Sequence, residues 1–307
     1  MEINIRNDTV PSLGRYPISL LDHEVVQDWV NDLVDRGLAP STVRKAFHCL
    51  SAIMEAAVTA GRISKSPCGG IRLPKPVPQS MRFLTAEDLH FLAAEHQPRY
   101  RALVLTAGYL GPRWSELVPL TPSDVSLLHR RMTISHALVE VQGRLVPGKP
   151  KSFGSTRTIT IPDFLVGVLE DHLAEFPPSH GFVFSSPQGG PVRRYFRTRE
   201  FVPAVNRAGL APLHIHDLRH TAAGLAISMG AHPKVIQEGL GHASIRTTLD
   251  TYGHPVPQPR RGTLPGSERP RTNRRRRILA ACDRSRQVGS SGSSTIRGPD
   301  QGLFLWR

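Results

Sequence analysis

Six residues spread along this 307-residue chain have side chains suited to transferring a phosphoryl group. They are, in chain order, Arg113, Lys151, His216, Arg219, His242 and Tyr252. Two arginines can clamp phosphate oxygens with paired N–H donors and so stabilise an in-line transfer. A tyrosine hydroxyl becomes a nucleophile when a base accepts its proton, and a lysine can protonate a leaving oxygen. These residue types together predict phosphoryl transfer with a tyrosine nucleophile.

Each motif is weak when taken alone. Arg113 and Glu116 have the spacing of an ordinary ion pair on a helix. A turn lysine such as Lys151 is usually solvated, and an isolated histidine is more often structural than catalytic. The pair His216 and Arg219 is a stronger indication of a site, because residues three apart on a helix point in the same direction. The prediction therefore depends on the complete ordered set.

A zinc enzyme is one alternative class. His216 and His220 are four residues apart, a spacing that zinc ligands on a helix can use, and His214 is nearby. Asp217 stands where an HExxH motif needs glutamate, and the sequence offers no clear third ligand. We therefore expect no metal site.

Charge points to a polyanionic partner, either nucleic acid or an anionic membrane surface. The chain has 39 Lys and Arg against 25 Asp and Glu, a net charge of +14 and a pI near 10.6. Much of the excess lies in residues 260–307, which hold 12 arginines and 3 acidic residues. No apolar run is long enough to span a membrane, and residues 1–10 do not resemble a signal peptide. Three widely spaced cysteines suit a reducing cytosol.

Most of the elements that must position these residues are predicted to be helices. The apolar spacing predicts helices over 19–36 and 42–60, the second capped by Ser41. Thr85 is expected to open a helix, residues 99–110 to form a buried helix, and Pro162 to start one that runs to 175. Further helices are expected over 193–208, 216–229, 233–239 and 244–252. Strands are expected over 132–141 and 157–162, on either side of a turn with the sequence QGRLVPGKP.

Composition divides the chain into four parts. Residues 1–63 form a helical domain, and the proline-rich segment 64–80 reads as a linker. Residues 81–254 form a second domain, mainly α with a small antiparallel β-sheet. Residues 255–307 lack periodicity and are expected to be a basic, disordered tail.

Four ordered motifs resemble the tyrosine recombinases, the phage integrase type of site-specific recombinase. GPRWSEL resembles the family's first-arginine motif, and PKSFGSTRTITIP its lysine-bearing β-hairpin. HIHDLRHTAAGLAISMG and LGHASIRTTLDTYGH resemble the boxes that hold the remaining residues, including the nucleophile. The resemblance covers about residues 12–254 and extends to a helical core-binding (SAM-like) DNA-binding domain.

The resemblance implies a role for each residue. Tyr252 would attack the scissile phosphodiester, giving a 3′-phosphotyrosyl link and a free 5′-hydroxyl. Arg113 and Arg219 would hold the non-bridging oxygens, Lys151 would act as general acid, and His216 as base or hydrogen-bond partner. His242 would contact the phosphate, while Glu116 would support Arg113 or a neighbouring histidine. No cofactor, metal or ATP is implied. Lys149 also lies in the turn, but Lys151 fits the spacing to Arg157-Thr158 better.

The implied partners are double-stranded DNA, a homotetramer on that DNA and an accessory directionality factor, in the cytoplasm at the nucleoid. Thr42, Arg44, Lys45 and Lys75 are candidate contacts to the DNA backbone, with solvated charge as the competing interpretation. Because the core-binding helices are expected to begin almost at once, we expect no arm-binding domain before them. Prolines follow Tyr252 where the family has a segment that packs on a neighbouring protomer. A catalytically impaired or remnant DNA-binding homologue is therefore the alternative function.

Overall fold

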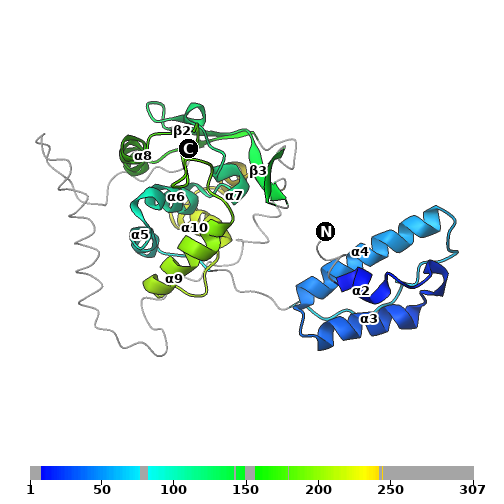
Figure 1. Cartoon of the computed structure of the whole chain (residues 1–307). Helices are drawn as coiled ribbons and strands as arrows, with labels where there is room; N and C mark the ends of the chain where they lie inside the picture. Colours follow the sequence, from blue (N-terminus) through cyan, green and yellow to red (C-terminus); the bar gives the residue numbers. More distant parts are fainter. Residues whose placement is uncertain are drawn as a thin grey trace, which may run out of the picture. The chain divides into compact units, whose positions relative to one another are not determined.

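The computed structural model describes residues 8–76, 82–141, 143–148, 156–178, 180–241 and 244. The chain divides between residues 80 and 81 into two compact units (Figure 1). We call the described residues 8–76 the helical unit and those from 82 onward the mixed unit. Lys151, His242, Tyr252, the helix expected after residue 244 and the expected tail lie outside the described residues.

The helical unit is built around a pair of helices, α3 (His23–Asp35) and α4 (Pro40–Thr59), preceded by α2 (Val10–Leu13) and the 3-10 turn η2 (Ile18–Leu20). The Asp22 carboxylate caps α3 by accepting from the Val25 N–H at 2.9 Å. The cap predicted at Ser41 is wrong. Ala39 is the N-cap of α4 because Pro40 occupies the first helical position, where a missing N–H costs nothing.

The chain after α4 stays packed on this unit beyond the predicted boundary at residue 63. Cys68 is buried in the same apolar cluster as α3 and α4. Gln27 exchanges two hydrogen bonds with the Arg72 backbone, and Arg44 donates to the Pro74 carbonyl at 3.4 Å. The first half of the segment predicted as a linker therefore belongs to the helical unit.

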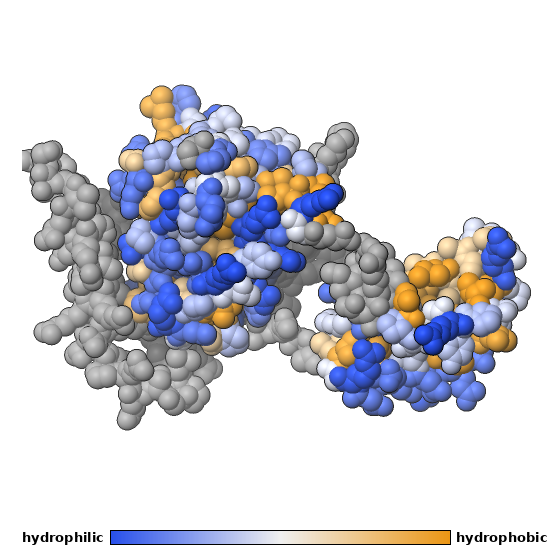
Figure 2. Space-filling view, in the orientation of Figure 1, coloured by the Kyte–Doolittle hydropathy of each residue, from blue (hydrophilic) through white to orange (hydrophobic). Residues whose placement is uncertain are grey.

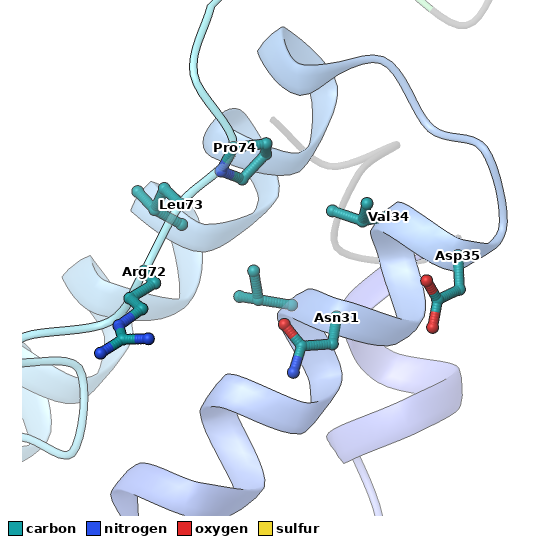
Figure 3. Close-up of a pocket in the computed structure, with 7 residues that line it drawn as sticks. Asn31, Val34, Asp35, Arg72, Leu73 and Pro74 are labelled. Atoms are coloured by element: carbon teal, nitrogen blue, oxygen red, sulfur yellow. The ribbon is translucent and has the colours of Figure 1, made fainter.

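This returning segment borders an open pocket of ≈ 490 Å³ on α3. Figure 3 shows Asn31, Val34 and Asp35 on α3 facing residues 72–74 across it. Figure 2 shows orange, apolar surface on this unit, and several large apolar side chains of the unit are exposed. They include Val10, Tyr16, Leu20 and Ile53.

Helix α6 (Pro98–Leu110) is the centre of the mixed unit, with ten of its 13 residues buried. It packs against α5 (Ala86–Ala94), α8 (Asp163–Glu175) and α10 (Ile215–Ser228) (Figure 1). The remaining helical elements are α7 (Trp114–Leu117), η3 (Pro122–Asp124), η4 (Arg197–Phe201), α9 (Val202–Ala208) and α11 (Pro233–Leu240). The helix starts expected at Thr85 and Pro162 are confirmed, and both residues are N-caps. No helix in the described ranges is both long and apolar enough to cross a membrane.

Within the described ranges, five short strands form two antiparallel sheets. β1 (Val125–Ser126), β2 (Arg131–Ile134) and β5 (Arg157–Thr160) make one, with Met132 opposite Ile159. β3 (Ala137–Val141) and β4 (Arg144–Gly148) make the other, a hairpin with Leu138 opposite Pro147.

Two strand predictions need correction. The strand expected over 132–141 is interrupted at Ser135 and His136, where the His136 ring lies 3.0 Å from the Pro119 carbonyl oxygen. Most of the segment predicted as a turn is strand β4. Its glycines and proline suggested a loop, but cross-strand pairing with β3 decides the conformation.

Candidate active site

Arg113 and Glu116 form the first part of the site at the start of α7. Gly111 ends α6 in a left-handed conformation, and Arg113 is the N-cap of α7. The Glu116 carboxylate accepts from the Arg113 backbone N–H at 2.9 Å and from its guanidinium at 2.8 Å. Glu116 is only 3% exposed, whereas the Arg113 side chain keeps 42% of its surface open. Arg113 can therefore reach an external anion while its hydrogen bonds to the buried Glu116 fix its position.

Arg157, at the start of β5, contacts the same carboxylate. Its Nη2 donates to Glu116 Oε2 at 2.7 Å, and its Nε donates to the Gly239 carbonyl at 2.7 Å. The Arg157 side chain is 7% exposed. In the sequence this residue served only to choose between Lys149 and Lys151, and its place in the site was not predicted. The feature that could have indicated it is an arginine at the first position of a strand, on the same side as the buried Ile159 two residues later.

The pKa of Glu116 reflects this environment. Burial alone would raise it, but the hydrogen bond and charge of Arg157, with the donors of Arg113, more than offset burial. The net result is a pKa below the ordinary value, so the carboxylate stays ionised and both arginines keep a charged partner.

Arg219 approaches from α10 and is 4% exposed. It donates to the Gly111 carbonyl and to the Leu240 carbonyl, both at 2.7 Å. Arg113 donates in addition to the Gly241 carbonyl at 3.0 Å. Three arginines from three elements thus bind three consecutive carbonyls at the end of α11, and we call Arg113, Arg157 and Arg219 the arginine cluster. The last carbonyls of a helix lack partners within it and carry partial negative charge, which explains the attraction.

Two glycines permit this close approach. Gly241 follows α11 with φ +66°, and a Cβ there would lie 2.8 Å from Arg157 Nη1. Gly111 also has φ +66°, and its Cβ would lie 2.7 Å from the Leu240 side chain. Both positions favour glycine because of the left-handed backbone as well as the contact.

His216 lies one turn before Arg219 on α10 and remains exposed. Partial desolvation lowers its pKa, and the charges of Arg219 and Arg113 lower it further, against the opposing effect of Asp217. Its ring meets that of His220 edge-on, with 4.9 Å between centroids. Neutral imidazole is the form that can accept a proton, so the cations favour the state a base needs.

The structure thus brings together four of the predicted residues: Arg113, Glu116, His216 and Arg219. The other three, Lys151, His242 and Tyr252, are not described, although His242 directly follows Gly241 in the sequence. Within the described ranges no group of three or more histidine, cysteine or acidic side chains is arranged to hold a metal ion.

The four candidate DNA contacts lie in the helical unit. Lys45 and Lys75 are exposed, and Thr42 is half-buried. Arg44 is also half-buried and spends a donor on the Pro74 carbonyl. The two lysines are therefore the more accessible cations.

A basic and aromatic surface on the mixed unit was missed by sequence analysis. The guanidinium carbons of Arg194 and Arg199 lie 5.5 and 5.3 Å from the centre of the Tyr195 ring, which is 51% exposed. Arg193 and Arg197 are exposed on the same segment. The run RRYFRTR in the sequence was the available signal.

Comparison with known proteins supplies an independent line of information. The model of the phage integrase family matches residues 82–258. The chain is 25% identical to the ICEBs1 integrase of Bacillus subtilis over 252 residues, covering 78% of this chain and 68% of the relative. It is 30% identical to a prophage phiRv2 integrase of Mycobacterium tuberculosis over 260 residues, covering 76% and 68%. The chain spans about two thirds of the length of these relatives.

Solved structures share the fold. The Tn1549 transposon integrase in complex with a circular intermediate DNA matches with a TM-score of 0.73 and 20% identity, over 82% of this chain and 87% of that one. A lambda integrase dimer bound to a COC′ core site matches with a TM-score of 0.58 and 20% identity, over 80% and 87%. Both neighbours confirm the expected fold class, mainly α with small antiparallel sheets.

Proposed function

Because the chain belongs to the phage integrase family of tyrosine recombinases, we propose that it is a site-specific DNA recombinase. It cleaves and rejoins DNA strands in the integration or excision of a mobile element. Tyr252 attacks the scissile phosphodiester, forming a 3′-phosphotyrosyl link and releasing a 5′-hydroxyl. The free 5′-hydroxyl of another strand then attacks that link, which restores a phosphodiester and frees the tyrosine.

One observation carries the proposal: Arg113 and Arg219 both bond carbonyls at the end of α11, and His216 lies one turn before Arg219 on α10. Two guanidiniums at one place can stabilise the charge that builds up on a phosphate during in-line transfer. A neutral His216 can accept a proton from the nucleophile. Lys151 then protonates the leaving 5′ oxygen, and His242 contacts the phosphate.

The reaction in this form needs neither ATP nor a metal ion. The energy of the broken phosphodiester is kept in the phosphotyrosyl link, so rejoining is nearly balanced. Arg113 and Arg219 supply the charge that a metal ion provides in other phosphoryl transfers.

Duplex DNA is the proposed partner. The Arg193–Arg199 surface and the exposed lysines of the helical unit provide cations for backbone phosphates, so affinity should fall steeply with salt. Synapsis of two sites requires four protomers, and we extend the proposal to a homotetramer on DNA, an accessory directionality factor and action at the nucleoid. Residues 1–63 and 81–254 would act as core-binding and catalytic domains.

A covalent adduct on DNA is the test. The full-length protein first selects its site from a pool of random-sequence duplexes, and the selected sequence is rebuilt as a nicked suicide duplex. Wild type should form an adduct that survives denaturation, and Tyr252→Phe should not. A wild type that binds the selected duplex without forming adduct would instead support the remnant, DNA-binding alternative.

A further inference from the structure

Arg157 connects three separate parts of the mixed unit through one guanidinium. It stands at the start of β5, bonds Glu116 on α7 and bonds the Gly239 carbonyl on α11. The donors point along two edges of the planar group, with Nε to the carbonyl and Nη2 to the carboxylate. A second donor, Nη1, lies 3.3 Å from the other Glu116 oxygen, so the carboxylate is held at two points.

The elements that Arg157 connects are those whose relative position the reaction depends on. Glu116 holds Arg113, and the chain leaves α11 through Gly241 directly into His242, ten residues before Tyr252. Arg113 and Arg219 also bond this helix end, but both are assigned to the phosphate. Arg157 is nearly buried and donates to Glu116 and to the Gly239 carbonyl.

We propose that Arg157 is a positioning residue: it fixes the end of α11 against the Glu116–Arg113 pair, and so sets the approach of the nucleophile-bearing segment to the phosphate. The proposal rests on the proposed recombinase function. Arg157 touches no reacting atom in this scheme and acts through Glu116 and Gly239.

The substitution Arg157→Lys keeps the positive charge but changes the geometry of the hydrogen bonds. A lysine ammonium is a single donor point, so it can keep the charge beside Glu116 but cannot hold the Gly239 carbonyl with the same spacing. Misplacing reacting groups by about 1 Å can cost on the order of 10²-fold in rate. The full chain carrying Arg157→Lys should therefore bind DNA normally and cleave slowly.

The experiment follows single-turnover adduct formation on the nicked duplex described above. For Arg157→Lys we expect a rate constant lower than wild type by on the order of 10-fold to 10²-fold. The final adduct yield and the Kd for an unnicked duplex should stay within about twofold. A merely structural role would lower the yield, through a smaller folded fraction, and leave the rate constant of the remaining molecules unchanged.

Arg207→Lys is the matched control. Arg207 also pairs with a glutamate, Glu95, in the same unit, but its side chain is 53% exposed and lies outside the cluster. Its rate constant should equal that of wild type. Arg157→Gln, which also removes the charge, should cleave more slowly than Arg157→Lys. If Arg157→Gln does not fold, Arg157→Lys still decides the question.

The outcomes separate the two proposals. No adduct from wild type rejects the recombinase function. An active wild type with an equally fast Arg157→Lys variant, or with a variant that loses yield and not rate, rejects the positioning role and leaves the function standing.

Discussion

The helix pair α3–α4 of the helical unit and the arginine cluster of the mixed unit bury different kinds of side chain. Every buried residue of α3 and α4 in the helical unit is apolar, and the ion pair of Asp32 with Arg36 stays on the surface. In the mixed unit Glu116 and Arg219 are almost fully buried, in contact with other charges and with backbone carbonyls.

The difference separates two ways in which a structure is stabilised. Apolar burial is non-directional and tolerates changes that preserve volume. A buried polar network depends on each partner, because removing one leaves another unsatisfied in a medium of low dielectric constant. Charge substitutions should therefore be mild on α3 and α4 and severe around the arginine cluster.

The largest effect is expected for Arg219→Ala. It removes a phosphate clamp and leaves the Gly111 and Leu240 carbonyls without this donor. Adduct formation on the nicked duplex should fall by about 10²-fold to 10³-fold. The comparison is Arg44→Ala, which removes a half-buried arginine from the helical unit and should alter DNA affinity more than the cleavage rate. A near-normal rate in Arg219→Ala would show that this arginine is misassigned.

Glu116→Gln tests the buried pairing directly. Removing one member of a buried ion pair costs about 3–5 kcal/mol because the remaining charge is uncompensated. Denaturant unfolding should show a loss near the low end of that range, since the amide still offers one oxygen acceptor. Asp32→Asn breaks the exposed Asp32–Arg36 pair, while Arg36 keeps Asp8 as a partner, and should change stability by less than about 0.5 kcal/mol. Equal losses would remove the proposed contrast.

Gly241→Ala should have a smaller effect on stability and a specific effect on cleavage. The new methyl group would lie 2.8 Å from Arg157 Nη1 on a left-handed backbone. Gly230→Ala is the matched control, since Gly230 has φ +77° and nothing within 4 Å of its Cβ position. The left-handed backbone alone should cost each variant about 1–2 kcal/mol in unfolding free energy. Only Gly241→Ala should also slow adduct formation, and equal rates would argue against the importance of the close contact.

Lowering the pH should reduce the unfolding free energy of the mixed unit gradually, and by less than the substitutions above. Burial lowers the pKa of His96 and His172, and Glu116 also has a lowered pKa. A lowered folded-state pKa means that the contribution is complete above the unfolded value and is lost as pH falls. The histidine contributions should decline below their ordinary pKa of 6.5, and that of Glu116 below 4.5.

Tryptophan fluorescence can follow each unit separately in the full chain. Trp29 reports on the helical unit and Trp114, stacked on Phe196, on the mixed unit. With the other tryptophans replaced by phenylalanine, Trp114 fluorescence should report a lower denaturant midpoint for the mixed unit at pH 5 than at pH 7. Parallel loss at Trp29 would contradict the expected difference.

Local signals in the sequence predicted most of the helices. Thr85 and Pro162 mark helix starts by their own chemistry, and the apolar spacing on α3 and α4 shows which face is buried. The Ser41 cap failed because Pro40 competes for the same turn, and β4 was missed because its stability comes from pairing with β3.

The candidate site was predictable as far as residue type and order revealed it. Arg113, His216 and Arg219 belong to motifs with several specific residues, and the structure brings them together with Glu116. Arg157 was missed because its importance comes from Gly239, 82 residues away. No local pattern reports a contact of that kind, and helix ends attract cations only after the fold has formed.

The three arginines at the end of α11 also leave the site with a charge imbalance. They carry three positive charges against one carboxylate and the helix end, which counts for about −0.5. An excess of roughly +1.5 thus remains where the cations are packed and partly desolvated. One DNA phosphate would remove most of it. The DNA would then act as a structural counter-ion, and the mixed unit should be at its most stable when it is bound to its own substrate.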